Sequence, residues 1–302
     1  MSVKRAKGLI QRLAASHQGL LERVDPDALI ALLDRDAEAH LYQNVPATVR
    51  DVWAATERDF GVTGLAALHM FTLLILIERF GARSAGKRYT PAICAKFTDS
   101  FTRILDAIEN EPGGAYQATD DPFLKDLGLC RQRLFPAGAQ VVNPHSGFHR
   151  AMLMRGGPTQ SVRFMKMLLE CGGNRPFYEI HTHLSELEDF NPDGWDQCYL
   201  RIAGMLELNP EIRGMWGGSW FYDPAMAQVS PNLCYLRERP QQNGAKVFFS
   251  NISLDSGALA KSKTRRDLYE QGKYMPKAYA LIWQRDALIG WAHAFSGQRR
   301  NA

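Results

Sequence analysis

Apolar residues in the first 135 positions recur at the three- and four-residue spacing that is typical of amphipathic helices. Asp25 and Pro26 combine a capping residue with a first-turn proline. Expected helices cover residues 26–40, 46–60, 65–77, 91–110 and 122–134. The 65–77 helix is apolar on nearly all sides, which predicts that it forms the buried centre of a helical bundle.

After Pro136 the pattern changes to short apolar and aromatic runs that alternate with helical segments. Strands are expected at 140–142, 151–154, 177–184, 212–222, 245–252 and 278–283, with a continuation of the last at 287–291. Helices are expected at 159–170, 194–208, 231–239 and 256–271. Such alternation predicts an α/β layer around one mixed or mostly parallel sheet. The fold class is therefore α/β (α+β), with a helical domain over 1–135 and a mixed-sheet domain over 136–302.

The composition excludes some classes of protein but does not indicate a binding partner. The 302 residues are 45% hydrophobic and 23% charged, which excludes a disordered or fibrous chain. The net charge of +4 is too small to indicate a dedicated nucleic-acid binder. Five cysteines without a C-x-x-C pair indicate reduced thiols and a cytoplasmic location. The most apolar stretch is too short to span a bilayer, so no membrane span is expected.

The segment from Gly244 onward has the order strand, loop, helix and strand, and its helix contains Leu268-Tyr269-Glu270. This segment resembles the closing portion of the GNAT N-acyltransferase superfamily, in which a helix of the N-x-x-A-x-x-L-Y-E type precedes a glycine-aromatic turn. Ser262 stands in the place of the asparagine and Arg265 in that of the small residue. The pyrophosphate loop of the family has no copy here. Its nearest counterpart is Arg213-Gly-Met-Trp-Gly-Gly-Ser-Trp220, with different glycine spacing.

The resemblance implies an acyltransferase that takes an acyl group from acyl-CoA, or from the phosphopantetheine of an acyl carrier protein, to a small-molecule amine. In such a site Tyr269 donates a proton to the departing thiolate, and strand N–H groups hold the carbonyl oxygen. The cofactor-binding residues implied are Trp216, Gly217 and Gly218 for the pantetheine, and Ser262, Arg265 and Arg266 for phosphate, with further phosphate contacts at residues 230–232. A homodimer, formed through the helical half, is a further expectation.

His181 and His183 lie two residues apart on a predicted strand, and Glu179 precedes them with the same alternation. Alternation puts the three side chains on one face. As catalytic groups, any of them can take the proton of an attacking ammonium. As metal ligands, His181, His183 and Glu186 would form a zinc or iron site.

Three functions therefore remain open from the sequence. The first is N-acyl transfer, with Tyr269, His181, His183 and Glu179 as catalytic residues and no resident metal. The second is a metal-dependent enzyme centred on the two histidines. The third is a GNAT-like binding module without catalysis. Walker, G-x-S-x-G, H-E-x-x-H and Rossmann motifs are absent from the sequence, which argues against kinase, hydrolase and dehydrogenase functions.

Overall fold

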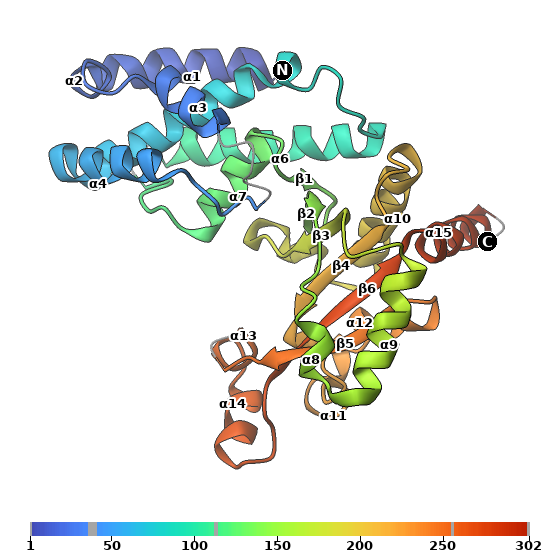
Figure 1. Ribbon diagram of the computed structural model, residues 1–302. Coiled ribbons are helices and arrows are strands. Elements are labelled where there is room, and N and C mark those ends of the chain that lie inside the picture. Colours follow the sequence, from blue (N-terminus) through green and yellow to red (C-terminus); the bar gives the residue numbers. More distant parts are fainter. Residues whose placement is uncertain (1, 36–40, 112–113, 255–256, 301–302) are drawn as a thin grey trace. The chain divides into compact units, whose positions relative to one another are not determined.

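A computed structural model describes residues 2–35, 41–111, 114–254 and 257–300 (Figure 1). The chain divides into two compact units. The helical unit comprises Met1–Pro136, Val141–Asn143 and His183–Ser185, and the sheet unit comprises Ala137–Gln140, Pro144–Thr182 and Glu186–Ala302. The expected combination of helices with one mixed sheet is confirmed.

Helices α1 to α7, coloured blue to green in Figure 1, build the helical unit. Their bounds are α1 Ser2–Ser16, α2 Gln18–Leu21, α3 Pro26–Arg35, α4 Ala47–Glu78, α5 Phe80–Arg83, α6 Pro91–Asn110 and α7 Asp121–Cys130. Local signals start two of them: Thr90 caps α6 and Asp120 caps α7, each followed by a proline in the first turn. The end predicted for the helix at 26–40 lies outside the described residues.

Helix α4 contains the two helices that the pattern predicted at 46–60 and 65–77. Gly61 separates them, because its φ of 69° is a left-handed conformation that glycine adopts without strain. Residues 65–74 are all buried, as expected for the centre of the bundle. By length and composition α4 could cross a membrane, but 72% of its most apolar window is buried inside the protein, as in the core helix of a globular domain.

The described residues form six strands: β1 Phe135–Pro136, β2 Val141–Ser146, β3 Phe177–His181, β4 Gly214–Ser219, β5 Lys246–Ile252 and β6 Lys277–Gln284. They follow the order β1-β2-β3-β4-β6-β5. Strands β3 and β4 are parallel, whereas β6 runs antiparallel to both of its neighbours, β4 and β5. The sheet is therefore mixed, and its parallel pair lies in the sheet unit.

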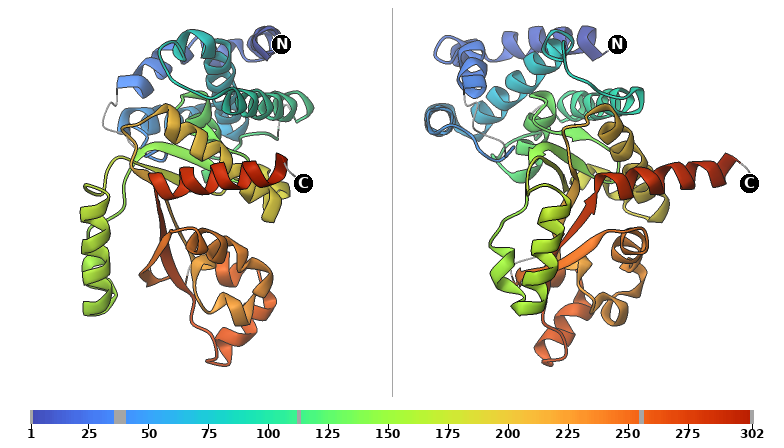
Figure 2. Two further views of the ribbon diagram at one scale, coloured as in Figure 1. Left: turned by 90° about the vertical axis from the view of Figure 1, so that its right-hand side faces the viewer. Right: turned by 45° about the vertical axis from the view of Figure 1, so that its right-hand side comes forward.

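Helices cover both faces of this sheet. On one face α8 (Met152–Arg155) and α9 (Gly157–Glu170) bury an aromatic and aliphatic cluster against the strands: Phe148, Met152, Phe164, Met167, Phe177, Phe248, Ala280 and Ile282. On the other face α10 (Pro192–Leu208) receives a hydrogen bond from the Tyr178 hydroxyl to the Met205 carbonyl, 3.3 Å long. Helix α15 (Arg285–Arg300) continues directly from β6 (Figure 2).

The remaining connections are short helices. After β4 come the 3-10 turn η2 (Trp220–Tyr222), α11 (Met226–Val229), η3 (Pro231–Leu233) and α12 (Tyr235–Gln242). Helices α13 (Gly257–Ala260) and α14 (Lys263–Glu270) lie between β5 and β6. A further 3-10 turn, η1 (Leu184–Asp189), follows β3. The helix with the Leu-Tyr-Glu sequence is thus α14, inside the connection between the last two strands.

Two predicted strands are wrong. Residues 152–154 are helical and Ala151 precedes them in a turn, because the Met152 and Leu153 amides donate to the His149 and Arg150 carbonyls three residues back. Residues 287–291 belong to α15, where Leu288, Trp291 and Ala292 are buried at helical spacing. The strand predicted over 212–222 ends at Ser219, since Trp220 begins a 3-10 turn.

Candidate active site

The parallel strands β3 and β4 pair over two residues only. Tyr178 lies opposite Met215 and Glu179 opposite Trp216. Beyond Trp216, β4 continues to Ser219 with β6 as its strand partner: Gly217, Gly218 and Ser219 pair with Leu281, Ala280 and Tyr279. Among the described residues no strand pairs with the opposite side of Gly217–Ser219. We call this side the open edge of β4.

Glycine is required at the start of the open edge. A Cβ atom on Gly217 would lie 2.6 Å from Cγ1 of Ile180, closer than real Cβ atoms approach a neighbour. A Cβ atom on Gly218 would meet nothing nearer than Cζ3 of Trp216 at 3.7 Å, and Gly218 is exposed. Gly217 therefore allows the backbone of β4 to lie close to β3. Gly218 has no side chain to cover the neighbouring peptide groups, so the backbone of β4 is accessible there.

Glu179 and His181 lie on one face of β3, as the alternation predicted. Oε2 of Glu179 is 3.8 Å from Nε2 of His181, and both side chains are largely buried. The Ser146 hydroxyl on β2 donates a hydrogen bond to the Glu179 carboxylate. Burial raises the pKa of Glu179 above its ordinary value, and the bond from Ser146 partly opposes this shift. A carboxyl group with a raised pKa beside an imidazole is suited to take and pass protons.

The expected pantetheine contacts at Trp216, Gly217 and Gly218 all belong to β4. The Trp216 side chain packs against the cluster beneath α8 and α9, with its ring centroid 6.5 Å from that of Phe148. Trp216 is the partner of Glu179 in the parallel ladder. The candidate proton acceptor and the predicted thioester-binding backbone therefore meet at the start of the open edge.

The predicted phosphate residues on α14 do not share one face. The Ser262 hydroxyl caps the helix by accepting a hydrogen bond from the Arg265 amide, 3.3 Å long. Arg265 is buried within the protein, whereas Arg266 is exposed. Lys263 is exposed and pairs with Asp267 at 2.7 Å. Arg266 and the neighbouring lysines are thus accessible to a phosphate, and Arg265 is not part of that surface.

Tyr269 lies on α14 one helical turn after Arg265, so the two side chains share a face of the helix. Its side chain is half-buried, and its hydroxyl makes no hydrogen bond to another described residue. No contact between described residues joins Tyr269 to Glu179 or His181. The position of the phenol relative to the open edge stays a prediction.

His183 belongs to the helical unit, and the expectation that its imidazole shares a strand face with His181 is wrong, because β3 ends at His181. Nε2 of His183 lies 3.3 Å from Oδ1 of the buried Asp126. Asp126 also accepts hydrogen bonds from Arg103 and from the Tyr116 hydroxyl. This network holds the residues after β3 against α6 and α7.

The alternative metal site is not assembled within the described part of the chain. Groups of three histidine, cysteine or acidic side chains in metal-binding geometry do not occur among those residues. Glu186 lies in η1, after the segment that enters the helical unit. The residues proposed as ligands, His181, His183 and Glu186, are therefore divided between the two units.

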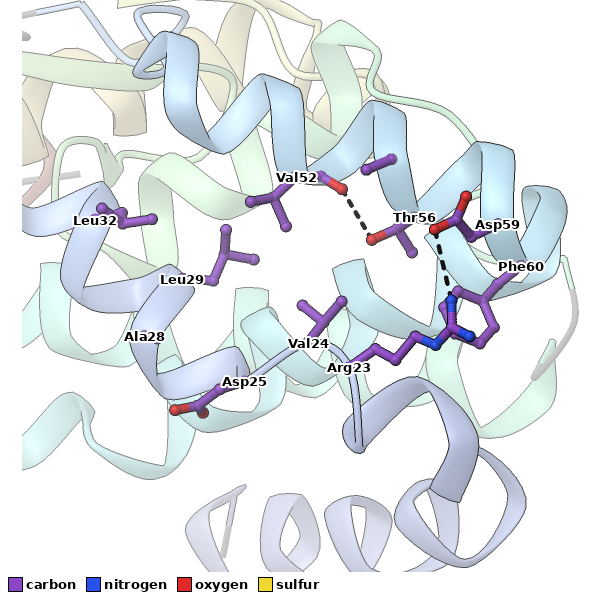
Figure 3. A pocket seen from close by; sticks show the side chains of 11 residues that line it. Arg23, Val24, Asp25, Ala28, Leu29, Leu32, Val52, Thr56, Asp59 and Phe60 are labelled. Atoms are coloured by element: carbon purple, nitrogen blue, oxygen red, sulfur yellow. Dashed lines mark hydrogen bonds and ion pairs between the residues drawn. The ribbon is translucent and has the colours of Figure 1, made fainter.

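The helical unit contains a cavity of about 370 Å³ that no sequence pattern predicted (Figure 3). Its wall is mainly aliphatic and comes from residues 23–32 and from the first half of α4: Arg23, Val24, Asp25, Ala28, Leu29, Leu32, Val52, Ala55, Thr56, Asp59 and Phe60. Arg23 lies 3.9 Å from Asp59 at one end, and the Thr56 hydroxyl donates to the Val52 carbonyl. Arg23, Asp59 and Thr56 are thus engaged with groups of the wall itself, and the Asp25 carboxylate accepts a hydrogen bond from the Asp27 amide.

Comparison with known proteins gives one structural similarity. No protein-family model matches the chain, and no curated protein matches it in sequence. A crystal structure of an acyltransferase in complex with decanoyl-CoA aligns with 92% of this chain and 87% of its own, at 16% identity and a TM-score of 0.47. A similarity this distant identifies neither the family nor the activity of the chain.

Proposed function

We propose that the sheet unit transfers an acyl group from a thioester to an amine at the open edge of β4. One observation carries this proposal: β4 loses its parallel partner directly after the residue pair that contains Glu179. Extended backbone that can accept a chain, and a carboxyl group that can accept a proton, thus lie next to each other. Acyl transfer to an amine needs both.

The open edge suits a pantetheine arm. Pantetheine is an extended chain with two amide groups, so it can bind an unpaired strand edge through main-chain hydrogen bonds. The exposed Gly218 leaves those backbone groups accessible. The same arm is present in CoA and in the prosthetic group of acyl carrier proteins. Arg266 and Lys261, which are exposed beside α14, would meet the phosphates of either donor.

The chemistry follows from the groups around the edge. Glu179 removes the proton of the attacking ammonium, directly or through His181, and the free amine attacks the thioester carbon. The N–H groups of residues 217–219 stabilise the negative charge that develops on the carbonyl oxygen. A C–N bond forms, the attacking nitrogen loses its second proton to solvent, and the C–S bond breaks. The thiolate takes a proton from Tyr269, which Glu179 restores through solvent. The products are an amide and a free thiol.

The test uses the purified full-length chain with short-, medium- and long-chain acyl-CoA and a panel of primary amines. Thiol release is followed with a chromogenic disulfide, and the amide is identified by mass spectrometry. Glu179→Gln keeps the size of the side chain and an oxygen for the Ser146 hydroxyl, and should lower the rate about 10²- to 10⁴-fold. Glu238→Gln, at an exposed position on α12, is the matched control. If no acyl-CoA releases thiol or yields an amide, acyl transfer from CoA is refuted. The same amine panel with an acylated carrier protein then shows whether a carrier protein is the donor.

A further inference from the structure

Arg265 is a buried arginine whose position is fixed on three sides. It is 7% exposed, its Nε donates to the Ala258 carbonyl at 2.6 Å, and its Nη1 donates to the Ser230 hydroxyl at 2.8 Å. The guanidinium carbon lies 4.3 Å from the centroid of the Trp220 ring. Within the described part of the chain, Arg265 forms no ion pair with a carboxylate. Its charge is therefore held by neutral groups.

A buried positive charge without a negative partner is unfavourable, because neutral hydrogen-bond acceptors replace only part of the lost hydration. Burial accordingly lowers the pKa of Arg265. Such a group is common where a protein binds an anion that supplies the missing charge. The planar fork of the guanidinium suits a carboxylate in particular.

Asp223 is a buried negative charge that lacks a positive partner among the residues described, the converse of Arg265. It follows η2 directly and is 3% exposed. Its Oδ1 accepts a hydrogen bond from the Ala225 amide at 3.0 Å, whereas its Oδ2 has no hydrogen-bond partner among the described residues. No described cation lies within 4.0 Å of this carboxylate. The second oxygen of Asp223 is thus available to a positively charged donor.

The pKa of Tyr274 responds to both Asp223 and Arg265. It is 5% exposed, and its hydroxyl has no hydrogen-bond partner among the described residues. Burial, together with the charge of Asp223, raises the pKa of Tyr274 to about 12, while the charge of Arg265 acts against this shift. Contacts place the two charges around one residue: the Asp223 amide donates to the Trp220 carbonyl at 3.0 Å, and the Arg265 guanidinium lies over the Trp220 ring. Arg265 and Asp223 nevertheless form no ion pair with each other within the described part of the chain.

The other titratable groups around Asp223 do not neutralise it. Tyr279 on β6 is half-buried, and its pKa is raised by burial and by Asp223, with Arg237 opposing the shift. Arg237 lies 3.6 Å from Glu238, which is exposed. Arg237 therefore already has a carboxylate beside it, while Asp223 has none.

We infer that Arg265 and Asp223 bind a free amino acid, with Arg265 taking its carboxylate and Asp223 its ammonium group. The inference rests on the proposed function, in which this amino acid is the amine that accepts the acyl group. Its place fits that role, because Trp220 directly follows Ser219, the last residue of the open edge. Trp220 and Tyr274 contribute aromatic surface and a free hydroxyl beside the two charges.

A site with one positive and one negative side chain binds a zwitterion better than a ligand that carries only a carboxylate or only an ammonium group. A carboxylic acid without an amine would satisfy Arg265 but leave Asp223 unpaired and would place two negative charges together. An amine without a carboxylate would leave Arg265 unpaired in the same way. Only a ligand that carries both groups compensates both buried charges, so discrimination against each half-molecule is expected to be strong.

Binding of amino acids to the full-length chain tests the inference without any acyl donor. The twenty proteinogenic amino acids are screened by ligand-observed NMR, and the affinity of each hit is measured by calorimetry. The decarboxylated amine and the deaminated acid of that hit are the comparison ligands. We expect each half-molecule to bind at least about tenfold more weakly than the amino acid. If none of the twenty binds, or if either half-molecule binds equally well, the inference is wrong.

Substitutions then test whether Asp223 binds the ammonium group and Arg265 the carboxylate of the amino acid. Asp223→Asn keeps the oxygen that accepts from Ala225, and should weaken amino-acid binding at least about tenfold while leaving binding of the deaminated acid unchanged or stronger. Arg265→Lys should weaken the amino acid and the deaminated acid together. Asp267→Asn, on the surface of α14, and Arg163→Lys, at an exposed arginine of α9 that lies 5.6 Å from the centroid of the Phe248 ring, are the matched controls. If Arg265→Lys does not fold, Asp223→Asn decides alone, and unchanged affinity in that variant overturns the inference.

Failure of the inference and failure of the proposed function give different results. A chain that binds acyl-CoA and acylates simple amines as fast as amino acids retains the proposed function and loses the zwitterion site. A chain that binds an amino acid through Asp223 but releases no thiol from any donor retains the site and loses acyl transfer.

Discussion

Glu179 lies opposite Trp216 in the last residue pair that joins β3 to β4. This pair and the preceding one, Tyr178 with Met215, make up the whole parallel ladder, and after them β4 pairs with β6 alone among the described strands. The carboxyl group with the raised pKa therefore sits where the backbone of β4 becomes available to a ligand. The proposed reaction needs this coincidence, and the pH dependence of the rate is the most direct way to examine it.

Ser146→Ala should shift the pH–rate profile to higher pH. Glu179 must be ionised to accept a proton, so the rate falls as the pH drops through its pKa. Burial raises that pKa, and the Ser146 hydroxyl lowers it by donating to the carboxylate. Removal of the hydroxyl leaves the burial effect unopposed, so the acidic limb of kcat/KM moves upward. Ser161→Ala, which removes a hydroxyl from α9, should leave the limb in place. A limb that moves downward in Ser146→Ala contradicts the role of Glu179 as the base.

Gly217→Ala and Gly218→Ala form a matched pair that tests the geometry of the open edge. The new Cβ at 217 would lie 2.6 Å from Ile180, so β3 or β4 must shift, which should lower the free energy of unfolding by about 1–3 kcal/mol. The new Cβ at 218 has its nearest neighbour at 3.7 Å, and the change should stay within about 0.5 kcal/mol. Urea denaturation measures both. Equal losses in the two variants would mean that β3 does not approach β4 at Gly217.

Local signals explain which elements the sequence predicts well. Helix α6 begins and ends where expected, because Thr90 and Pro91 define its first turn and its buried residues follow one helical period. Strands β5 and β6 lie where short apolar and aromatic runs predicted them. The apolar run at 287–291 belongs to α15 and not to the expected strand, because a run of five apolar residues fits a strand and a buried helix face equally well.

The candidate site depends more on tertiary structure. Alternation correctly predicts that Glu179 and His181 lie together. No local signal marks the end of β3 at His181, so the contact between His183 and Asp126 could not be predicted. Adjacent helical residues point about 100° apart, so Arg265 and Arg266 had to face different surroundings, and the sequence does not tell which of them is buried. Ser146 comes to Glu179 from a strand far away in the sequence.

Asp126→Asn should destabilise the helical unit at neutral pH. Asp126 is fully buried, and its partners His183 and Arg103 lower its pKa from 3.8 to about 2 against the opposing effect of burial. A carboxyl group with a depressed folded-state pKa stabilises the fold above its unfolded pKa, and this stabilisation is lost as the pH falls from about 3.8 to about 2. The linked contribution is about 2 kcal/mol, and removal of the charge beside Arg103 raises the total loss to about 3–5 kcal/mol at pH 7.

Urea denaturation of the wild-type chain and of Asp126→Asn, at pH 7 and near pH 3, measures this effect. The difference between the two proteins should shrink at the lower pH. Near pH 3 the unfolded wild-type chain binds a proton at Asp126, whose ordinary pKa is 3.8, while the folded chain keeps the carboxylate ionised, so the wild-type fold loses stability. Asp121→Asn, which removes a half-exposed charge paired with Lys125, is the control and should cost about 1 kcal/mol or less. A difference between wild type and Asp126→Asn that does not change with pH would show that the carboxylate charge does not stabilise this network.

Ala55→Leu and Ala67→Leu should have opposite consequences, although both enlarge an alanine on α4. Ala55 lines the cavity of about 370 Å³, so a leucine side chain there buries apolar surface in existing space and should leave the free energy of unfolding unchanged or raise it by up to about 1 kcal/mol. Ala67 is 0% exposed in the centre of the bundle, so the same change overpacks the core and should cost about 1–3 kcal/mol. Thermal and urea unfolding of the two variants measure the difference, and equal destabilisation would show that the wall of the cavity closes over the space in solution.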